Sequence, residues 1–207
     1  HSAIDALLEL RDRYGLGPKN VDHILSWIHP RQLTHTFRPD PKSELDAKFS
    51  VQYVLARTLM HGQINIEHFD PGAHDDIDTR AVMARILANI AHQSDTTAEP
   101  HPSPGDSSDE HFNIEIKVTT VSGKIHSLAL REPVGRGSLS RLPPGVVRDK
   151  FDNCTGRLLA ADKAAALGDA VESLETLDDV RELTSIVADG GLSENTGAPA
   201  SISTAIA

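Results

Sequence analysis

The chain has 207 residues, of which 39% are hydrophobic and 24% are charged, a composition typical of a globular protein that buries a core in one or two domains. Its net charge of −10 argues against nucleic acid as a partner, because phosphate binding needs a basic patch. No apolar run approaches the ~18 residues of a membrane span, so we expect no membrane association and a cytoplasmic protein, or a mitochondrial one in a eukaryote.

The first forty residues predict a helix, a strand and a loop. Apolar spacing predicts a helix over residues 2–14, which ends at the Gly- and Pro-rich breaker 15–18. Residues 21–28 are rich in strand formers with approximate alternation, so they predict a strand that ends at Pro30. Residues 31–43 are then polar and cationic and are expected to form a loop.

A single amphipathic helix is predicted over residues 44–61. Ser43, with Asp46 three positions later, is a typical N-cap signal, and Gly62 ends the apolar periodicity. The apolar stripe of this helix, which we expect to be buried, consists of Phe49, Tyr53, Ala56 and Met60.

The second half of the chain predicts another helix, a polar insertion, a hairpin and a helical end. Helical spacing of Ile and Ala predicts a helix over 76–92, and the near absence of apolar residues predicts a solvated, mobile insertion over 93–110. Two strands within 112–130 would be joined by a turn at Ser122–Gly123. Three helices and a disordered tail are then expected at 145–160, 161–173, 177–188 and 189–207.

This order of elements predicts an α+β fold with two structural units. Residues 1–133 form the α+β unit, and residues 134–188 form an all-helical unit that precedes the tail.

Several stretches, in the same order along the chain, resemble one known family. The most informative is 38–62, which reads Arg-Pro, then acidic-Ala-Lys-Phe-Ser-x-x-Tyr-x-x-Ala, then Gly. The opening 1–6 is similar to the motif His-x-x-Ile-Asp-Ala of that family, and 118–124 is similar to its strand, Gly turn and strand. Residues 133–137 and 150–154 are similar to its Gly-rich loop and its Lys-Phe-x-x-Cys helix. The chain thus resembles the C-terminal part of the MmgE/PrpD family.

The resemblance implies a fold and an activity. Members include 2-methylcitrate dehydratase, an enzyme of propionate metabolism, and cis-aconitate decarboxylase. The α+β unit would correspond to the family's small lid domain, and the last helices to its all-helical main domain. The chain would then be part of a cofactor-independent lyase that acts on a small di- or tricarboxylate by His-mediated proton transfer. An isomerase or epimerase of the same family is an alternative.

Members of the family are about twice as long as this chain, which starts at His1 without a Met. We therefore expect a helical N-terminal half in the same or a separate chain, no turnover by the isolated chain, and a homo-oligomer, for which a dimer is the default. A different class of function stays open, namely a non-catalytic interaction or oligomerisation subunit derived from the lid domain. The third possibility is that these 207 residues are a truncated part of a full-length enzyme.

The resemblance also singles out candidate site residues. The reaction needs a proton carrier with a pKa near neutral, for which histidine is the default, and groups that hold carboxylates. The candidates for catalysis are His1, His35 and Tyr53, and those for carboxylate binding are Arg38, Lys48 and Ser50. Tyr53 could equally be a core residue whose hydroxyl is satisfied.

Other polar residues have simpler interpretations. His74 lies in acidic surroundings and is expected on the surface, whereas Cys154 is expected to be a small buried residue of a helix. The sequence has no CxxC and no HExxH, so we expect no metal site. We expect no cofactor either, because proton transfer next to activated carboxylates does not demand one.

Overall fold

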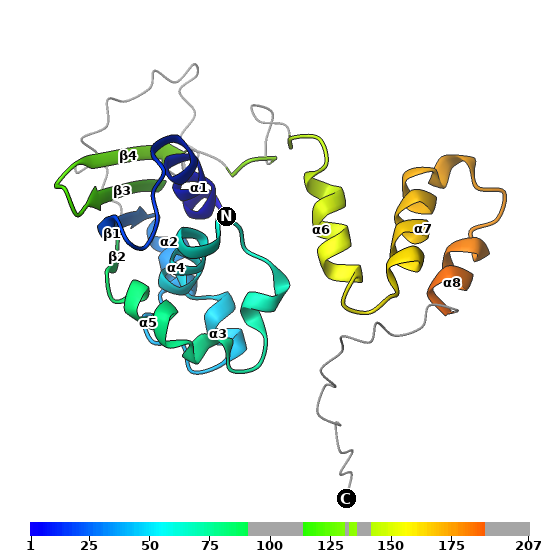
Figure 1. Ribbon diagram of the computed structural model, residues 1–207, viewed down its shortest axis with the longest axis horizontal. Coiled ribbons are helices and arrows are strands. Elements are labelled where there is room, and N and C mark those ends of the chain that lie inside the picture. The colour runs from blue at the N-terminus through cyan, green and yellow to red at the C-terminus, as the bar shows by residue number, and fades with distance from the viewer. Residues whose placement is uncertain (91–113, 131–132, 136–141, 189–207) are drawn as a thin grey trace, which may run out of the picture. The chain divides into compact units, whose positions relative to one another are not determined.

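The computed structural model describes residues 1–90, 114–130, 133–135 and 142–188 (Figure 1). The chain divides between residues 141 and 142 into two compact units, which are described separately below. The predicted insertion 93–110 and the predicted tail 189–207 lie outside the described residues.

The first unit contains a mixed four-stranded sheet with the order β2-β1-β3-β4. Strand β1 (Val21–Ile28) runs parallel to β2 (Ile86–Ile90) and antiparallel to β3 (Ile114–Thr120), which forms a hairpin with β4 (Ile125–Leu130). Gly123 has a φ of 80° in the hairpin turn, a conformation that glycine adopts without steric cost. The strands confirm the predicted α+β class.

Helices pack against this sheet and form the core with it (Figure 1). Helix α1 (Ser2–Tyr14) contacts β3 and β4, helix α4 (Val51–His61) contacts β2, and the two helices contact each other. Fully buried side chains at their contact include Leu7, Leu10 and Leu59. Burial of each such side chain contributes about 1.5–3 kcal/mol, so this core holds α1 and α4 in fixed positions.

The predicted loop over 31–43 is wrong in its first part, where helix α2 (Pro30–Thr36) forms. Proline is favoured at the first helical position because its missing N–H would have no partner there. The hydroxyls of Thr34 and Thr36 donate to the carbonyls of Pro30 and Gln32, so these two threonines support the helix. The prediction gave too much weight to the polar composition.

The single helix predicted over 44–61 is two helices, α3 (Glu44–Lys48) and α4. Ser50 caps α4, since its Oγ accepts a hydrogen bond of 3.1 Å from the backbone N–H of Tyr53. The break rotates Phe49 out of the expected stripe and leaves it 49% exposed.

The helix predicted over 76–92 is also wrong beyond residue 83. Helix α5 (Ile77–Met83) ends there, and β2 follows after two residues. In β2, Ile86 lies opposite Ile24 of β1 and the pairing continues to Ile90 opposite Ile28. The ladder with β1 pairs the backbone of this segment along one edge, and this pairing outweighs its helical spacing.

The second unit consists of α6 (Val146–Thr155), α7 (Ala161–Glu172), a short 3₁₀ helix (Leu174–Thr176) and α8 (Arg181–Ala188). Arg148 joins α6 to α7, because its Nη1 donates to Asp169 and Glu172 at 3.0 Å. A side chain at Gly168 would place its Cβ 2.7 Å from Cζ of Arg148, so the guanidinium would have to shift.

The helices of the second unit bury little. Helices α6 and α8 contain no buried residue, and Cys154, which was expected to be buried, is exposed on α6. Large exposed apolar side chains of this unit include Val147, Leu158, Val171, Val180 and Val187. Within the described residues, no helix is long and apolar enough to cross a bilayer.

Candidate functional site

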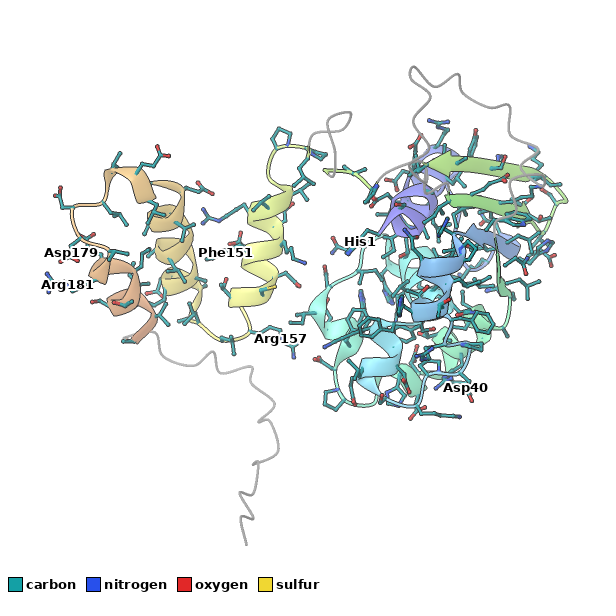
Figure 2. The ribbon with its side chains drawn as sticks, turned by 180° about the vertical axis from the view of Figure 1, so that it is seen from behind. His1, Asp40, Phe151, Arg157, Asp179 and Arg181 are labelled. Carbon is teal, nitrogen blue, oxygen red and sulfur yellow. The ribbon has the colours of Figure 1, made fainter. Side chains whose placement is uncertain are left out.

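His1 lies directly before α1 and is exposed to solvent (Figure 2). Its backbone carbonyl accepts the hydrogen bond of Asp5, but its side chain forms no capping hydrogen bond. Asp5 in turn accepts a 2.9 Å hydrogen bond from the backbone N–H of Val134, which ties the first turn of α1 to the segment after the hairpin. The imidazole of His1 is therefore attached to a helix that is held in place, and it does not cap that helix.

His35 lies in the last turn of α2 and Arg38 in the connection to α3, and both are exposed. The Nη1 of Arg38 donates to the carbonyl of Phe37 at 3.0 Å. Among the described residues no carboxylate pairs with Arg38, so its guanidinium is available to an anionic ligand. Lys48, at the end of α3, is exposed as well.

Ser50 connects this exposed segment to the core. Its Oγ donates a 2.5 Å hydrogen bond to the carbonyl of Arg38 and accepts one from the N–H of Tyr53. The side chain of Ser50 is 1% exposed, which places its hydroxyl out of reach of solvent. Hydrogen bonds thus bring Arg38, Ser50 and Tyr53 together, whereas those of the described residues do not join His1, His35 or Lys48 to them.

Tyr53 is fully buried, and its hydroxyl is surrounded by hydrogen-bonding partners. It donates to the carbonyl of His68, lies 3.2 Å from the carbonyl oxygen of Ala73, and accepts from Nε of Arg57 at 3.0 Å. The Nη2 of Arg57 also donates to Ala73 at 2.7 Å, and its Nη1 lies 3.6 Å from Asp76. Of the two interpretations of Tyr53, these contacts favour the core residue with a satisfied hydroxyl.

Two buried histidines adjoin this cluster and were not predicted as such. His74 was expected on the surface, but it is 9% exposed, because bonds from Tyr53 and Arg57 to Ala73 draw its 3₁₀ turn (Ala73–Asp75) against α4. His68 is 8% exposed, and its ring stacks on that of His61 with 4.6 Å between centroids. Periodicity carries no signal for such residues, since they lie in short 3₁₀ turns.

The environment of His68 keeps its ring neutral. The backbone N–H of Asn65 donates to Nδ1 at 3.0 Å, so this nitrogen carries no proton and the other ring nitrogen does. Burial lowers the pKa of His68, and the neighbouring His61 and Arg57 lower the pKa further. A proton on Nδ1 would also break the bond to Asn65.

We therefore expect stability to fall with acidification. The unfolded chain takes up a proton at His68 below its ordinary pKa of about 6.5, while the folded state resists that proton until a lower pH. The free energy of unfolding should decrease as the pH falls below about 6.5, and His68→Gln should flatten this slope. Urea unfolding at several pH values between pH 5 and 7.5 measures the free energy of unfolding of both proteins. His23→Gln, at a partly exposed histidine, is the control. If the free energy of unfolding of His68→Gln depends on pH as steeply as that of the wild type, His68 is not the cause of the pH dependence.

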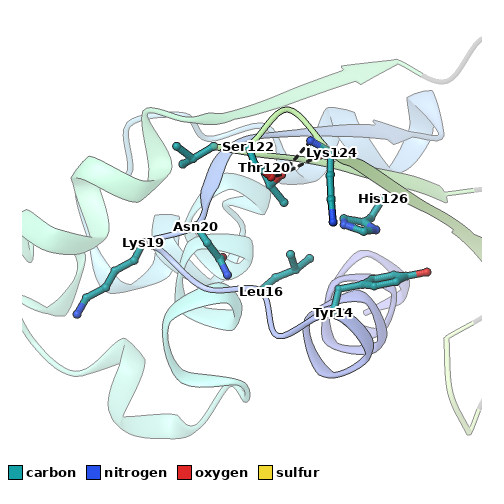
Figure 3. A pocket seen from close by; sticks show the side chains of 9 residues that line it. Tyr14, Leu16, Lys19, Asn20, Thr120, Ser122, Lys124 and His126 are labelled. Atoms are coloured by element: carbon teal, nitrogen blue, oxygen red, sulfur yellow. Dashed lines mark hydrogen bonds between the residues drawn. The ribbon is translucent and has the colours of Figure 1, made fainter.

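A cavity of about 500 Å³ lies elsewhere in the first unit, between the end of α1 and the hairpin turn (Figure 3). Tyr14 and His126 stack at its side with 3.9 Å between ring centroids. His1 and Tyr14 are at opposite ends of α1, about 20 Å apart for a helix of this length. None of the predicted site residues lines this cavity. In the described part of the chain, no group of His, Cys, Asp and Glu side chains is arranged to hold a metal ion.

Comparison with known proteins decides the family. The family described as MmgE/PrpD C-terminal domain matches residues 1–176. The chain belongs to the MmgE/PrpD family. It is also similar to cis-aconitate decarboxylase of Mus musculus, with 27% identity over 151 residues, which are 72% of this chain. The chain spans only 28% of the length of that relative.

Proposed function

We propose that this chain is the lid-domain part of a lyase that acts on a small di- or tricarboxylate without a cofactor. The observation that carries this proposal is the MmgE/PrpD C-terminal domain match over residues 1–176. The similarity to cis-aconitate decarboxylase supports a decarboxylase-like or dehydratase-like reaction. The exposed cation Arg38, which has no carboxylate partner in the described residues, supports an anionic substrate.

The proposal assigns roles to the candidate residues. His1 transfers the proton, since its imidazole is exposed and forms no capping hydrogen bond to α1. Arg38 holds a substrate carboxylate, and the exposed His35 and Lys48 are further polar groups that could contact the substrate. Ser50 acts on the site through the backbone of Arg38, to which it donates. Tyr53 has a structural role, because its N–H donates to Ser50 and its buried hydroxyl forms hydrogen bonds with His68 and Arg57.

The second unit supports a need for further polypeptide. Helices α6 and α8 bury no residue of their own, and the exposed valines and leucines of this unit form apolar surface. We propose that a helical domain, in the same or a separate chain, covers this surface and completes the site. A non-catalytic interaction module is the second candidate, and the same exposed apolar surface favours it.

The two functions are separated by an assay of the native assembly. The complete protein, purified with whatever chain accompanies it, is incubated with 2-methylcitrate, citrate and cis-aconitate, and products are followed by mass spectrometry. Dehydration or decarboxylation of one of them, and no turnover by the isolated 207-residue chain, would support the lyase. A stable assembly that converts none of them would favour the interaction module.

Arg38→Ala is expected to raise KM about 10–100-fold, because a charge-assisted hydrogen bond to a carboxylate is worth about 1.5–3 kcal/mol. The change in kcat should be smaller, since the contact is formed in the ground state as well as in the transition state. Steady-state kinetics of the complete assembly measure both. Arg13→Ala is the matched control, because Arg13 is an exposed arginine of the same unit, paired with Glu9. Equal KM values in the two variants would refute the assignment.

A further inference from the structure

Arg80 connects α5 to the segment that carries Arg38. Its Nη1 donates to Oδ1 of Asp40 at 2.6 Å, and its Nη2 donates to the carbonyl of Pro41 at 2.6 Å. A third contact, at 3.2 Å, joins Nη2 to Oδ1 of Asp75. The guanidinium thus binds two consecutive residues that lie about forty positions earlier in the chain. One of its acceptors is a backbone carbonyl, so the contact restrains the main chain itself.

The helix that carries Arg80 is firmly anchored. Asp76 caps α5, since its Oδ2 accepts hydrogen bonds from the N–H of Thr79 at 3.0 Å and from its hydroxyl at 2.5 Å. Thr79 is fully buried, and Val82 and Met83 belong to the core. Arg80 therefore transmits the rigidity of the core to whatever it binds.

The segment 38–42 is held at several other points. The hydroxyl of Ser50 fixes the carbonyl of Arg38, and the N–H of Lys42 donates to Oδ2 of Asp46 at 3.1 Å. The side chain of Pro41 is fully buried, and the ammonium of Lys42 lies 2.5 Å from Asp40. Hydrogen bonds from Lys42 and Arg80 lower the pKa of Asp40, so its carboxylate stays charged for this contact. The backbone is thereby restrained, while the guanidinium of Arg38 stays exposed.

We propose that Arg80 is a positioning residue for carboxylate binding: it fixes the backbone of residues 38–42 so that Arg38 is ordered before the substrate arrives. This inference rests on the proposed role of Arg38. A clamp that is already ordered loses less conformational freedom on binding, and the binding constant improves accordingly. Arg80 itself touches no substrate and acts through the loop.

Arg80→Met tests the inference, and Arg85→Met is its matched control. Arg85 also donates to two backbone carbonyls, those of Pro18 and Val21, but it does not contact residues 38–42. Both variants keep an unbranched apolar stem and lose a guanidinium that tethers the backbone. Amide hydrogen exchange of the peptide that covers residues 37–45 is measured in the complete protein, together with KM and kcat.

In Arg80→Met, we expect exchange in this peptide to be about tenfold faster or more, because local opening is no longer opposed. KM should rise about tenfold, with a smaller change in kcat. Arg80→Lys should lie between this variant and the wild type, and Arg85→Met should leave both readouts near the wild type even if its melting temperature falls. If Arg80→Met does not fold, Asp40→Asn weakens the contact from the exposed side, because it removes the charge that Arg80 binds and leaves the bond to Pro41, and it should speed exchange in the same peptide to a smaller extent.

Three outcomes overturn the inference or separate it from the proposed function. Unchanged exchange at 37–45 in Arg80→Met and Asp40→Asn would show that Arg80 does not restrain the loop. Faster exchange with an unchanged KM, in a protein whose KM does respond to Arg38→Ala, would show that the restraint is irrelevant to binding. If KM does not respond to Arg38→Ala, the proposed role of Arg38 fails, and the positioning role fails with it whatever the exchange shows.

Discussion

His1→Ala is expected to lower kcat of the complete assembly about 10²–10⁴-fold, the range contributed by a general acid or base. KM should change little, because a proton carrier acts on the transition state rather than on substrate binding. The melting temperature should also stay near the wild-type value, since the side chain of His1 is exposed and forms no capping hydrogen bond. Steady-state kinetics and thermal unfolding measure the three quantities.

His23→Ala is the matched control for this experiment, since His23 is a partly exposed histidine whose contact is with the neighbouring Asp22. It should leave kcat unchanged. If His1→Ala lowers both kcat and the melting temperature substantially, His1 has a structural role. Near-wild-type kinetics in His1→Ala would exclude His1 from the site.

Tyr53→Phe is expected to cost about 1–3 kcal/mol of the free energy of unfolding, because it leaves buried hydrogen-bonding groups without a partner. The hydroxyl donates to the carbonyl of His68 and accepts from Nε of Arg57, and both are buried residues. Urea unfolding followed by circular dichroism measures the loss. If Tyr53 acted as a catalytic acid instead, kcat would fall by orders of magnitude with the stability intact.

Tyr14→Phe provides the comparison, since the ring of Tyr14 is 46% exposed and stacks on His126. Loss of a hydroxyl from such a site should change the free energy of unfolding by less than about 0.5 kcal/mol. Equal effects in the two variants would mean that the hydrogen bonds of Tyr53 contribute nothing net.

Local signals were sufficient for some elements and misleading for others. The breaker after Tyr14, the alternation in β1 and the turn at Gly123 act within a few residues, and each predicted its element. Ser50 has the same chemistry as Ser43, yet it stands inside an apolar run and gave no sign of a second N-cap. The pairing of β2 with β1 joins segments about sixty residues apart, and such non-local hydrogen bonds leave no periodic trace.

In the candidate site, too, some residues could be predicted from local motifs and others depend on contacts between distant segments. The family resemblance selected His1 and Arg38 by their motifs, and both are exposed. The residues that hold the surrounding backbone, Arg57 and Arg80, looked like ordinary charged residues of helices in the sequence. Their partners are backbone carbonyls and carboxylates in distant loops, which only the folded chain brings within hydrogen-bond distance.

The hydrophobic core cluster lies entirely within the first unit, between Ala3 and Val118, with Leu128 and Leu130 packed against it. During synthesis, domains fold as units and those nearest the N-terminus fold first. The α+β unit can therefore reach its final packing while the later helices are still being made. Those helices bury little of their own apolar surface, and in the proposed assembly this surface stays exposed until a further helical domain covers it. In that proposed assembly, folding of the α+β unit and burial of the later helices would be two events in time, with different sensitivities to mutation.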